Sequence, residues 1–501
     1  MSQRTHRTAA AFVAALLAAG GGTAAAVSAS AASPACDTRT NNTVKNLLEC
    51  VTLDGVREHQ AALQQIADDN NGTRASGTPG YDASADYVAE RLQAAGWNVT
   101  RQEFNYQAFI NLAPAVVERV SPNPGPIDAT TMEYSGSGDV TAAVTALTPF
   151  STDATPGCEA SDFAGFTAGR IALIQRGGCA FAIKATNAYH AGAAGVMIYN
   201  NIPGALSGTL GNDFALEIPV VQTTQAVGQA LAATPGLVMH IKTSTFRGTA
   251  TTSNVLAELP GKNADNVVMA GAHLDSVDAG PGINDNGSGS SALIEVAENL
   301  GKVKPQNTVR FAWWGAEEAS LVGSDYYVDH LSQAERDKIA LYLNFDMIGS
   351  PNHVFFIYDG DDSDRTGAGP GPEGSAQIEK TFEAFFESRG IPYKGTDFSG
   401  RSDYGPFIAA GIPSGGLFTG AEGIKTAEEA ATWGGTAGIA YDPCYHQACD
   451  TYANNNAFAL EQNSDAVAYA VLNYAMNTSL INGAKAKGNF RSTASGHAST
   501  M

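Results

Sequence analysis

Six side chains of the kinds that bind metal ions stand where apolar runs of this sequence end: His273, Asp285, Glu317, Glu318, Asp346 and His446. Imidazoles and carboxylates are suitable ligands for divalent cations, and a pair of ions about 3.5–4 Å apart also needs one carboxylate that can bridge them. None of the segments is diagnostic alone. Together they predict a two-metal hydrolytic site.

Neighbouring residues add acid–base chemistry to this set. Asp275 stands two positions after His273, on the same side of a strand, and is expected to hold the second imidazole nitrogen. Adjacent buried acids such as Glu317 and Glu318 are costly without a cation, so one can bind metal while the other acts as general base toward water and a leaving amine. Tyr445, directly before the last histidine, offers a phenol that could stabilise an oxyanion.

Simpler interpretations remain for single segments. His273 to Asp275 could be a polar strand end, and Glu317 with Glu318 could be a capping pair at a helix start. The sequence contains no His-Glu-x-x-His and no Gly-x-Ser-x-Gly, so two other classes of hydrolase lack support.

The N-terminus is typical of a secretory signal. Arg4 and Arg7 precede an apolar stretch over residues 12–19 and small residues up to Ala31. The apolar part is about ten residues, against the roughly 20 that a membrane anchor needs. Cleavage near Ala31 would change the net charge from −21 to −23. Such acidity argues against nucleic acid and anionic membranes as partners and fits an extracellular protein.

The cysteines also favour an extracellular protein. An even number in sequence-local pairs predicts disulfides rather than a cysteine-rich metal site, although fifteen pairings are formally open. The expected pairs are Cys36 with Cys50, Cys158 with Cys179, and Cys444 with Cys449.

The remaining pattern predicts an α/β fold. Alternating apolar runs and helical periodicity predict helices at 54–66, 84–95, 291–300 and 378–388, and strands at 99–109, 267–272, 309–314, 341–345, 354–358 and 415–418. Most candidate ligands follow the carboxyl ends of these strands, where open α/β sheets bind ligands.

A different segment interrupts this pattern after residue 110. Its Gln175-Arg-Gly-Gly-Cys179 signature, followed by a helix-like stretch and an apolar run at 194–200, resembles the protease-associated domain inserted in several secreted peptidases. The expected division is a signal peptide at 1–31, peptidase parts at 32–109 and 249–480, the insert at 110–248, and a flexible tail at 481–501.

Over residues 51–106 and 250–478 the chain resembles the secreted di-zinc aminopeptidases of the aminopeptidase S and aminopeptidase Y type. The resemblance implies a mixed central sheet with helices on both faces, as in zinc exopeptidases. It also implies His273 and Asp346 on one zinc, Glu318 and His446 on the other, Asp285 bridging both, Glu317 as general base and Tyr445 polarising the carbonyl.

The resemblance further implies how substrate binds. A cis peptide would follow Asp285, and the free α-amine would lie near Glu317, Asp346 and the loop 400–403 that contains Arg401. The pocket for the first side chain would include Met347 and Phe418 and would favour Leu, Phe, Met or Val.

Two alternatives and one cofactor stay open. A carboxypeptidase or dipeptidase would need a cation for the substrate carboxylate, and Arg401 is the candidate; a non-catalytic binding relative would be expected to lack ligands. Relatives also hold calcium near the N-terminus, where Asp465 is retained but the other position is Cys50. We expect a monomer that acts on peptide N-termini.

Overall fold

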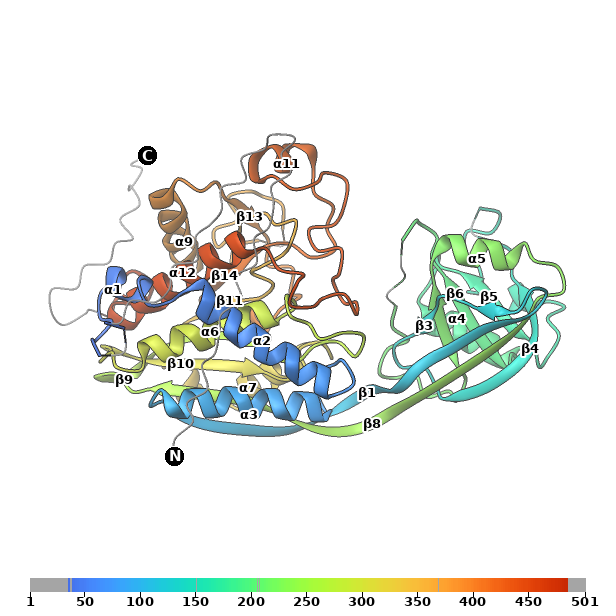
Figure 1. The fold of residues 1–501 in the computed structure, drawn as a ribbon, viewed down its shortest axis with the longest axis horizontal. Coiled ribbons are helices and arrows are strands. Elements are labelled where there is room, and N and C mark those ends of the chain that lie inside the picture. The colour runs from blue at the N-terminus through green and yellow to red at the C-terminus, as the bar shows by residue number, and fades with distance from the viewer. Residues whose placement is uncertain are drawn as a thin grey trace, which may run out of the picture.

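The computed structural model describes residues 35–484 except 37, 150, 205, 207 and 368, so the expected signal peptide and residues 485–501 of the tail lie outside it. Figure 1 shows two lobes joined by a long two-stranded ribbon. Within the described residues, no helix is both long and apolar enough to cross a membrane.

The larger lobe is built on a mixed sheet in the order β13-β12-β14-β11-β9-β10-β8. Strands β14, β11, β9 and β10 run parallel, while β12 and β8 pair antiparallel to their neighbours β14 and β10. The strands are β8 (Val238–Leu259), β9 (Asn263–His273), β10 (Asn307–Trp314), β11 (Ile339–Phe345), β12 (Phe356–Tyr358), β13 (Lys394–Thr396) and β14 (Ser414–Phe418).

Alternating side chains of these strands build two cores, one on each face of the sheet. On β11, Leu341, Leu343 and Phe345 join the larger core, whereas Tyr342 joins the smaller one. The larger core is closed by α1 (Val44–Leu48), α2 (Leu53–Asp69), α3 (Pro79–Ala94), α6 (Gly287–Leu300), α9 (Ser375–Arg389) and α12 (Ala457–Met476), and the smaller by α7 (Val322–Asp329) and α10 (Tyr404–Ala409). The predicted fold class is therefore confirmed.

Local capping explains where the N-terminal helices begin. The side chain of Thr52 accepts the Gly55 N–H before α2, and that of Thr78 accepts the Tyr81 N–H before α3. Because Pro79 suits the first helical turn, α3 starts earlier than the predicted residue 84.

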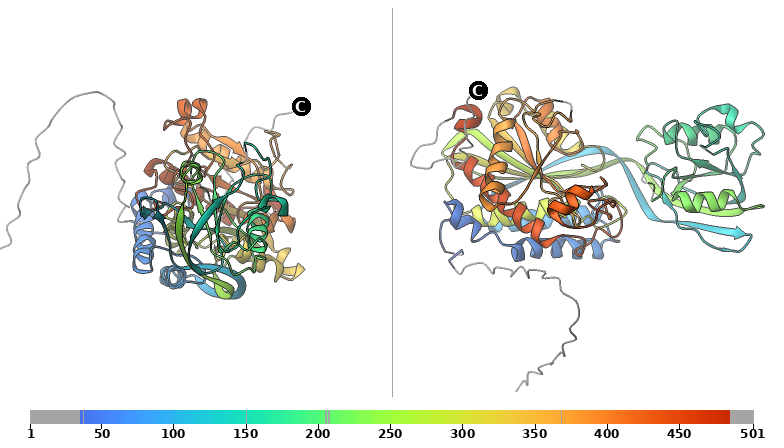
Figure 2. Two further views of the ribbon diagram at one scale, coloured as in Figure 1. Left: turned by 90° about the vertical axis from the view of Figure 1, so that its right-hand side faces the viewer. Right: turned by 90° about the horizontal axis from the view of Figure 1, so that it is seen from above.

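The ribbon is formed by β1 (Asn98–Ser121) and β8, which pair antiparallel from Asn98 opposite Glu258 to Ser121 opposite Val238. The predicted strand at 99–109 is thus less than half of β1. The insert boundaries that we place near 110 and 248 lie almost opposite each other, since Ala108 pairs with Gly248. Figure 2 shows that these two strands carry the chain between the lobes.

The smaller lobe contains the inserted segment. Its parallel strands β4 (Gly138–Ala146), β5 (Ile171–Gln175), β6 (Gly195–Tyr199) and β7 (Val220–Thr223) carry α4 (Phe181–His190) and α5 (Gln225–Ala232). Apolar residues from both faces of these strands form two separate cores. The remaining short elements of the chain are β2 (Gly125–Pro126), β3 (Thr130–Thr131), η1 (Ala160–Phe163), α8 (Gln333–Arg336), α11 (Ala427–Trp433) and α13 (Ser479–Asn482).

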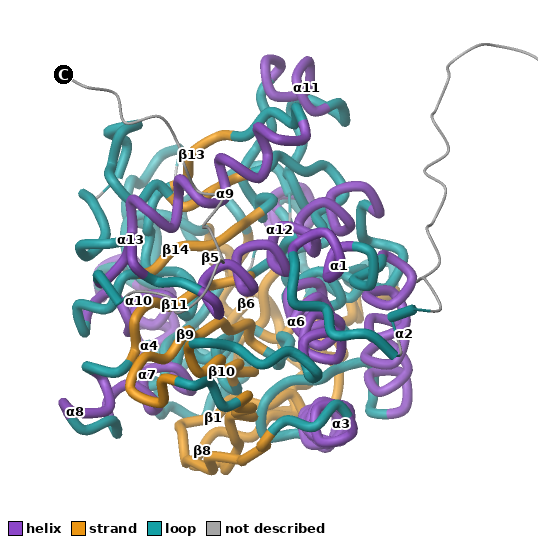
Figure 3. Tube along the Cα trace, turned by 90° about the vertical axis from the view of Figure 1, so that its left-hand side faces the viewer, coloured by secondary structure: helices purple, strands orange, loops and turns teal. Residues whose placement is uncertain are grey.

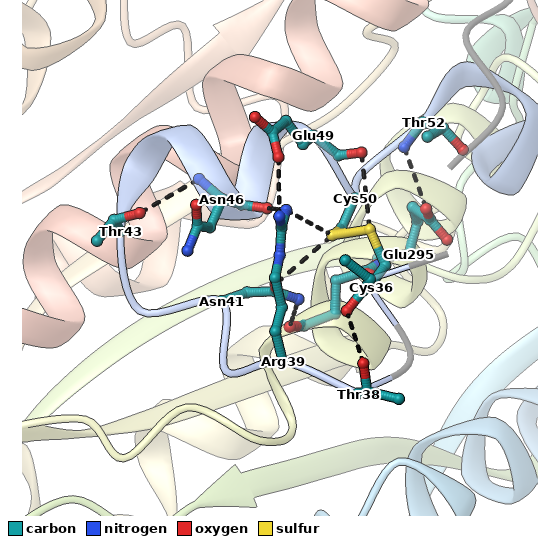
Figure 4. Close-up of a disulfide and its surroundings, with 12 residues drawn as sticks. Cys36, Thr38, Arg39, Asn41, Thr43, Asn46, Glu49, Cys50, Thr52 and Glu295 are labelled. Atoms are coloured by element: carbon teal, nitrogen blue, oxygen red, sulfur yellow. Dashed lines mark hydrogen bonds and ion pairs between the residues drawn. A yellow bond between two sulfur atoms is a disulfide. The ribbon is translucent and has the colours of Figure 1, made fainter. Parts of the chain in front are cut away.

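All three expected disulfides are present. Figure 4 shows Cys36–Cys50, which ties the first described residues to the turn before α2. Arg39 donates to the Asn46 carbonyl at 2.6 Å and pairs with Glu49 at 2.9 Å beside it. Cys50 is thus part of a closed structural loop.

Candidate metal and active site

Asp285 lies between two imidazoles and offers one carboxylate oxygen to each. Its Oδ1 is 3.2 Å from Nε2 of His273, and its Oδ2 is 3.2 Å from Nε2 of His446. These are the distances at which the three side chains could share two cations with the aspartate between them.

Each imidazole has a further carboxylate beside it. Asp346 Oδ1 lies 3.3 Å from His273 Nε2, and Glu318 Oε2 lies 3.0 Å from His446 Nε2. Within each group of His273, Asp285 and Asp346, and of Asp285, Glu318 and His446, the candidate ligand atoms lie within 4.8 Å of one another. Glu317 is more distant, with Oε2 at 3.9 Å from His273 Nε2.

Sheet topology explains how segments far apart in sequence meet. His273 is the last residue of β9, Asp346 directly follows the parallel strand β11, and the two glutamates follow β10 on the other side of β9. Asp285 precedes α6, and its peptide bond to Asn286 is cis, as the resemblance implied. Figure 3 shows these elements with the helices packed around the strands.

The charges at this site fit bound cations. Glu318 Oε1 and Asp346 Oδ1 are buried and find no hydrogen-bond partner in the described part of the chain. Burial opposes protonation of His273 and His446, but the surrounding carboxylates raise the pKa of both well above the usual range. Without cations, the site thus holds carboxylate oxygens that lack partners, and its two histidines tend to be protonated. Metal ions would bind these carboxylates and supply the positive charge that the protons otherwise provide.

Two polar neighbours orient the ligands. His273 Nδ1 lies 3.1 Å from the main-chain oxygen of Asp275 and 3.7 Å from its carboxylate, which instead accepts the Glu317 N–H at 3.2 Å. Asp275 therefore contacts both residues, although not mainly through the carboxylate–imidazole bond that we expected. Ser402 donates to Asp346 Oδ2 at 2.6 Å.

Two buried supports of the Asp285 loop were not predicted from the sequence. Asp450 accepts the N–H groups of Asn284 and Asp285, both at 2.9 Å. Arg74 donates to the carbonyls of Pro281 at 2.8 Å, Gly282 at 2.7 Å and Leu274. The one available signal was a lone arginine in a glycine-rich loop, which does not reveal its partners.

A cavity of about 290 Å³ opens onto the candidate ligands. Met347 and Phe418 line it, as expected, together with Phe356, Tyr358 and Tyr441. Arg401, Glu422 and Tyr445 form a more polar part of its wall. One apolar side chain could therefore lie beside the metal-binding groups.

Comparisons with known proteins agree with this architecture. Residues 254–471 match peptidase family M28, and residues 139–231 match the PA domain. The chain is 48% identical over 452 residues to an aminopeptidase of Pseudomonas aeruginosa, covering 88% of this chain and 84% of that one. It is 42% identical over 438 residues to leucine aminopeptidase 2 of Trichophyton equinum, covering 86% of each.

A solved structure has the same fold. BSAP, a zinc aminopeptidase from Bacillus subtilis, superposes with a TM-score of 0.62 at 26% identity, over 83% of this chain and 94% of that chain.

Proposed function

Because the chain belongs to peptidase family M28 and matches aminopeptidases over most of their length, we propose that it is a zinc-dependent aminopeptidase for peptides with apolar first residues. The observation that carries the proposal is the position of Asp285 between His273 and His446, with each imidazole accompanied by a further carboxylate.

The residues divide into two ligand groups around a shared aspartate. His273 and Asp346 would hold one zinc, Glu318 and His446 the other, and Asp285 both. Zinc at these positions would supply Lewis acidity toward the scissile carbonyl and the attacking water.

Glu317 is the proposed general base. Burial raises the pKa of its carboxyl well above the usual range, His273 opposes the shift, and Asp403 and Glu318 add to it. A carboxylate of raised pKa can take a proton from water at its Oε atom and later return that proton to the leaving amine nitrogen. Tyr445 would donate its phenol hydrogen to the carbonyl oxygen as negative charge develops there.

The cavity supports an N-terminal exopeptidase. The carboxylates of Glu317 and Asp346, which line the cavity, would hold a protonated α-amine, and Met347 with Phe418 would surround an apolar first side chain. A carboxypeptidase or dipeptidase would need a cation for the substrate carboxylate. Arg401, the candidate, is already ion-paired with Glu422 at 2.7 Å.

Hydrolysis of leucine p-nitroanilide beside its N-acetylated form, with and without a chelator, tests the proposal. We expect cleavage of the free-amine substrate only, loss of activity on chelation and recovery with zinc. Equal cleavage of the acetylated substrate, or full activity after metal removal, would contradict it.

We also propose that the mature protein is exported as a monomer without nucleic acid or membrane partners. Support comes from the acidic composition, the signal-like N-terminus and three disulfides, which persist in oxidising compartments. N-terminal sequencing and light scattering of protein from the culture medium test this. A mature start near residue 32 and a monomeric mass are expected, whereas an uncleaved, cell-bound chain or a stable oligomer would refute the corresponding part.

Calcium is not among the cofactors we propose, because Asp465 pairs with Arg389 at 2.7 Å and Cys50 forms a disulfide.

A further inference from the structure

Three loops meet at one wall of the cavity through the side chain of Arg401. Its Nη1 donates to Glu422 Oε1 at 2.7 Å, and its Nη2 donates to the Tyr445 hydroxyl oxygen at 3.1 Å. Arg401 lies between β13 and α10, Glu422 follows β14, and Tyr445 lies in the loop closed by the Cys444–Cys449 disulfide. All three contacting side chains line the cavity.

The chemistry of the guanidinium fixes the direction of the second hydrogen bond. Arginine carries only donors, so the Tyr445 oxygen must accept from Arg401. The phenol hydrogen then remains available for a different acceptor. The ring is also fixed from one side, since it stacks on the His446 imidazole with centroids 3.8 Å apart.

We propose that Glu422 and Arg401 form a positioning pair that holds Tyr445 with its hydroxyl hydrogen directed at the substrate carbonyl. This inference rests on the proposed function, in which Tyr445 stabilises the oxyanion. Glu422 fixes the guanidinium and neutralises its charge, which would otherwise compete with a protonated α-amine and with cations at the neighbouring ligands.

Loss of the pair should affect turnover rather than folding. The side chains of Arg401 and Glu422 are 59% and 56% exposed, and exposed ion pairs contribute little to stability. If Arg401 instead bound substrate directly, its loss would raise KM whether or not Tyr445 was intact. The two roles are therefore separable by kinetics.

A double-mutant cycle on leucine p-nitroanilide tests the proposal. We expect Tyr445→Phe to lower kcat by about 10²–10³-fold and Arg401→Met by about tenfold, with KM within about twofold of wild type. In the Tyr445→Phe background, Arg401→Met should change kcat by less than about twofold, because the group it positions is gone. Glu422→Gln should lower kcat by less than Arg401→Met does. Arg401→Lys should have a kcat between those of Arg401→Met and wild type.

Arg101→Met is the matched control, because Arg101 forms a similar ion pair with Asp86 at 2.7 Å on another part of the surface. It should leave kcat and KM unchanged. The positioning role would be overturned if the fold losses of kcat caused by Arg401→Met and Tyr445→Phe multiplied fully in the double mutant. It would also be overturned if Arg401→Met changed only KM. Absence of chelator-sensitive, free-amine-dependent cleavage by the wild type would instead refute the proposed function.

Discussion

Arg74 allows a sharp test of how the bridging aspartate is held. Its side chain is fully buried and its guanidinium donates to the carbonyls of Leu274, Pro281 and Gly282, which begin and end the turn before Asp285. Burial lowers the pKa of Arg74 to about 10, and nearby aspartates including Asp285 counter part of this shift. The residue therefore stays charged at neutral pH.

Arg74→Met should be strongly destabilising. It removes the donors to the buried carbonyls of Leu274 and Pro281, whereas the Gly282 carbonyl keeps the Gly287 N–H at 2.9 Å. At about 1–3 kcal/mol for each unsatisfied carbonyl, partial relaxation places the expected loss near 3 kcal/mol. Arg74→Lys keeps the charge but not the fork of donors, so roughly half of that loss is expected. Bound zinc should also fall, because the turn that presents Asp285 loses its anchor.

Urea unfolding in the presence of chelator measures this loss without the contribution of zinc, and zinc content is measured separately on holoprotein. Arg101→Met, at an exposed ion pair, should change the unfolding free energy by less than about 0.5 kcal/mol. An Arg74→Met protein within about 1 kcal/mol of wild type and fully loaded with zinc would refute the reasoning.

Two further predictions concern a disulfide and a buried acid. Replacing Cys444 and Cys449 by alanine should lower the free energy of unfolding by about 2 kcal/mol and remove most of the turnover. Replacing Cys36 and Cys50 should lower the free energy of unfolding by about 3 kcal/mol and leave kcat unchanged. Equal effects of the two replacements on kcat would contradict this prediction. Burial and two neighbouring aspartates raise the pKa of Glu379 from 4.5 to about 8. The wild-type free energy of unfolding should therefore fall as pH rises from 4.5 to 8. Glu379→Gln should be more stable than wild type by about 1–3 kcal/mol at pH 9 but not at pH 4.5. An equal stability difference at both pH values would contradict this role of Glu379.

Patterns that depend on strand order were predictable from the sequence. Parallel strands place their carboxyl ends at one edge, so His273 and Asp346 meet although 73 positions separate them in the chain. The same reasoning anticipated the glutamate pair after β10. The disulfide around His446 followed from cysteine spacing, and the ligand roles themselves came from the family resemblance.

Contacts made by loops were not predictable. Arg74, Ser402 and Asp450 satisfy backbone or ligand groups that reach them only after folding, and each stands in a segment that reads as an ordinary turn. The length of β1 was also missed: the strand was expected to end at residue 109, and Pro114, which lacks an N–H, lies within it. The register shifts between Ala113 and Val116, and such an irregularity accommodates a proline.

Glu317→Gln, assayed for zinc and turnover on the same protein, tests the central claim most directly. We expect two zinc ions per chain, as in wild type, and a fall in kcat of at least about 10²-fold on leucine p-nitroanilide. Normal turnover in Glu317→Gln, or a wild-type chain that is fully active with no zinc bound, would contradict it.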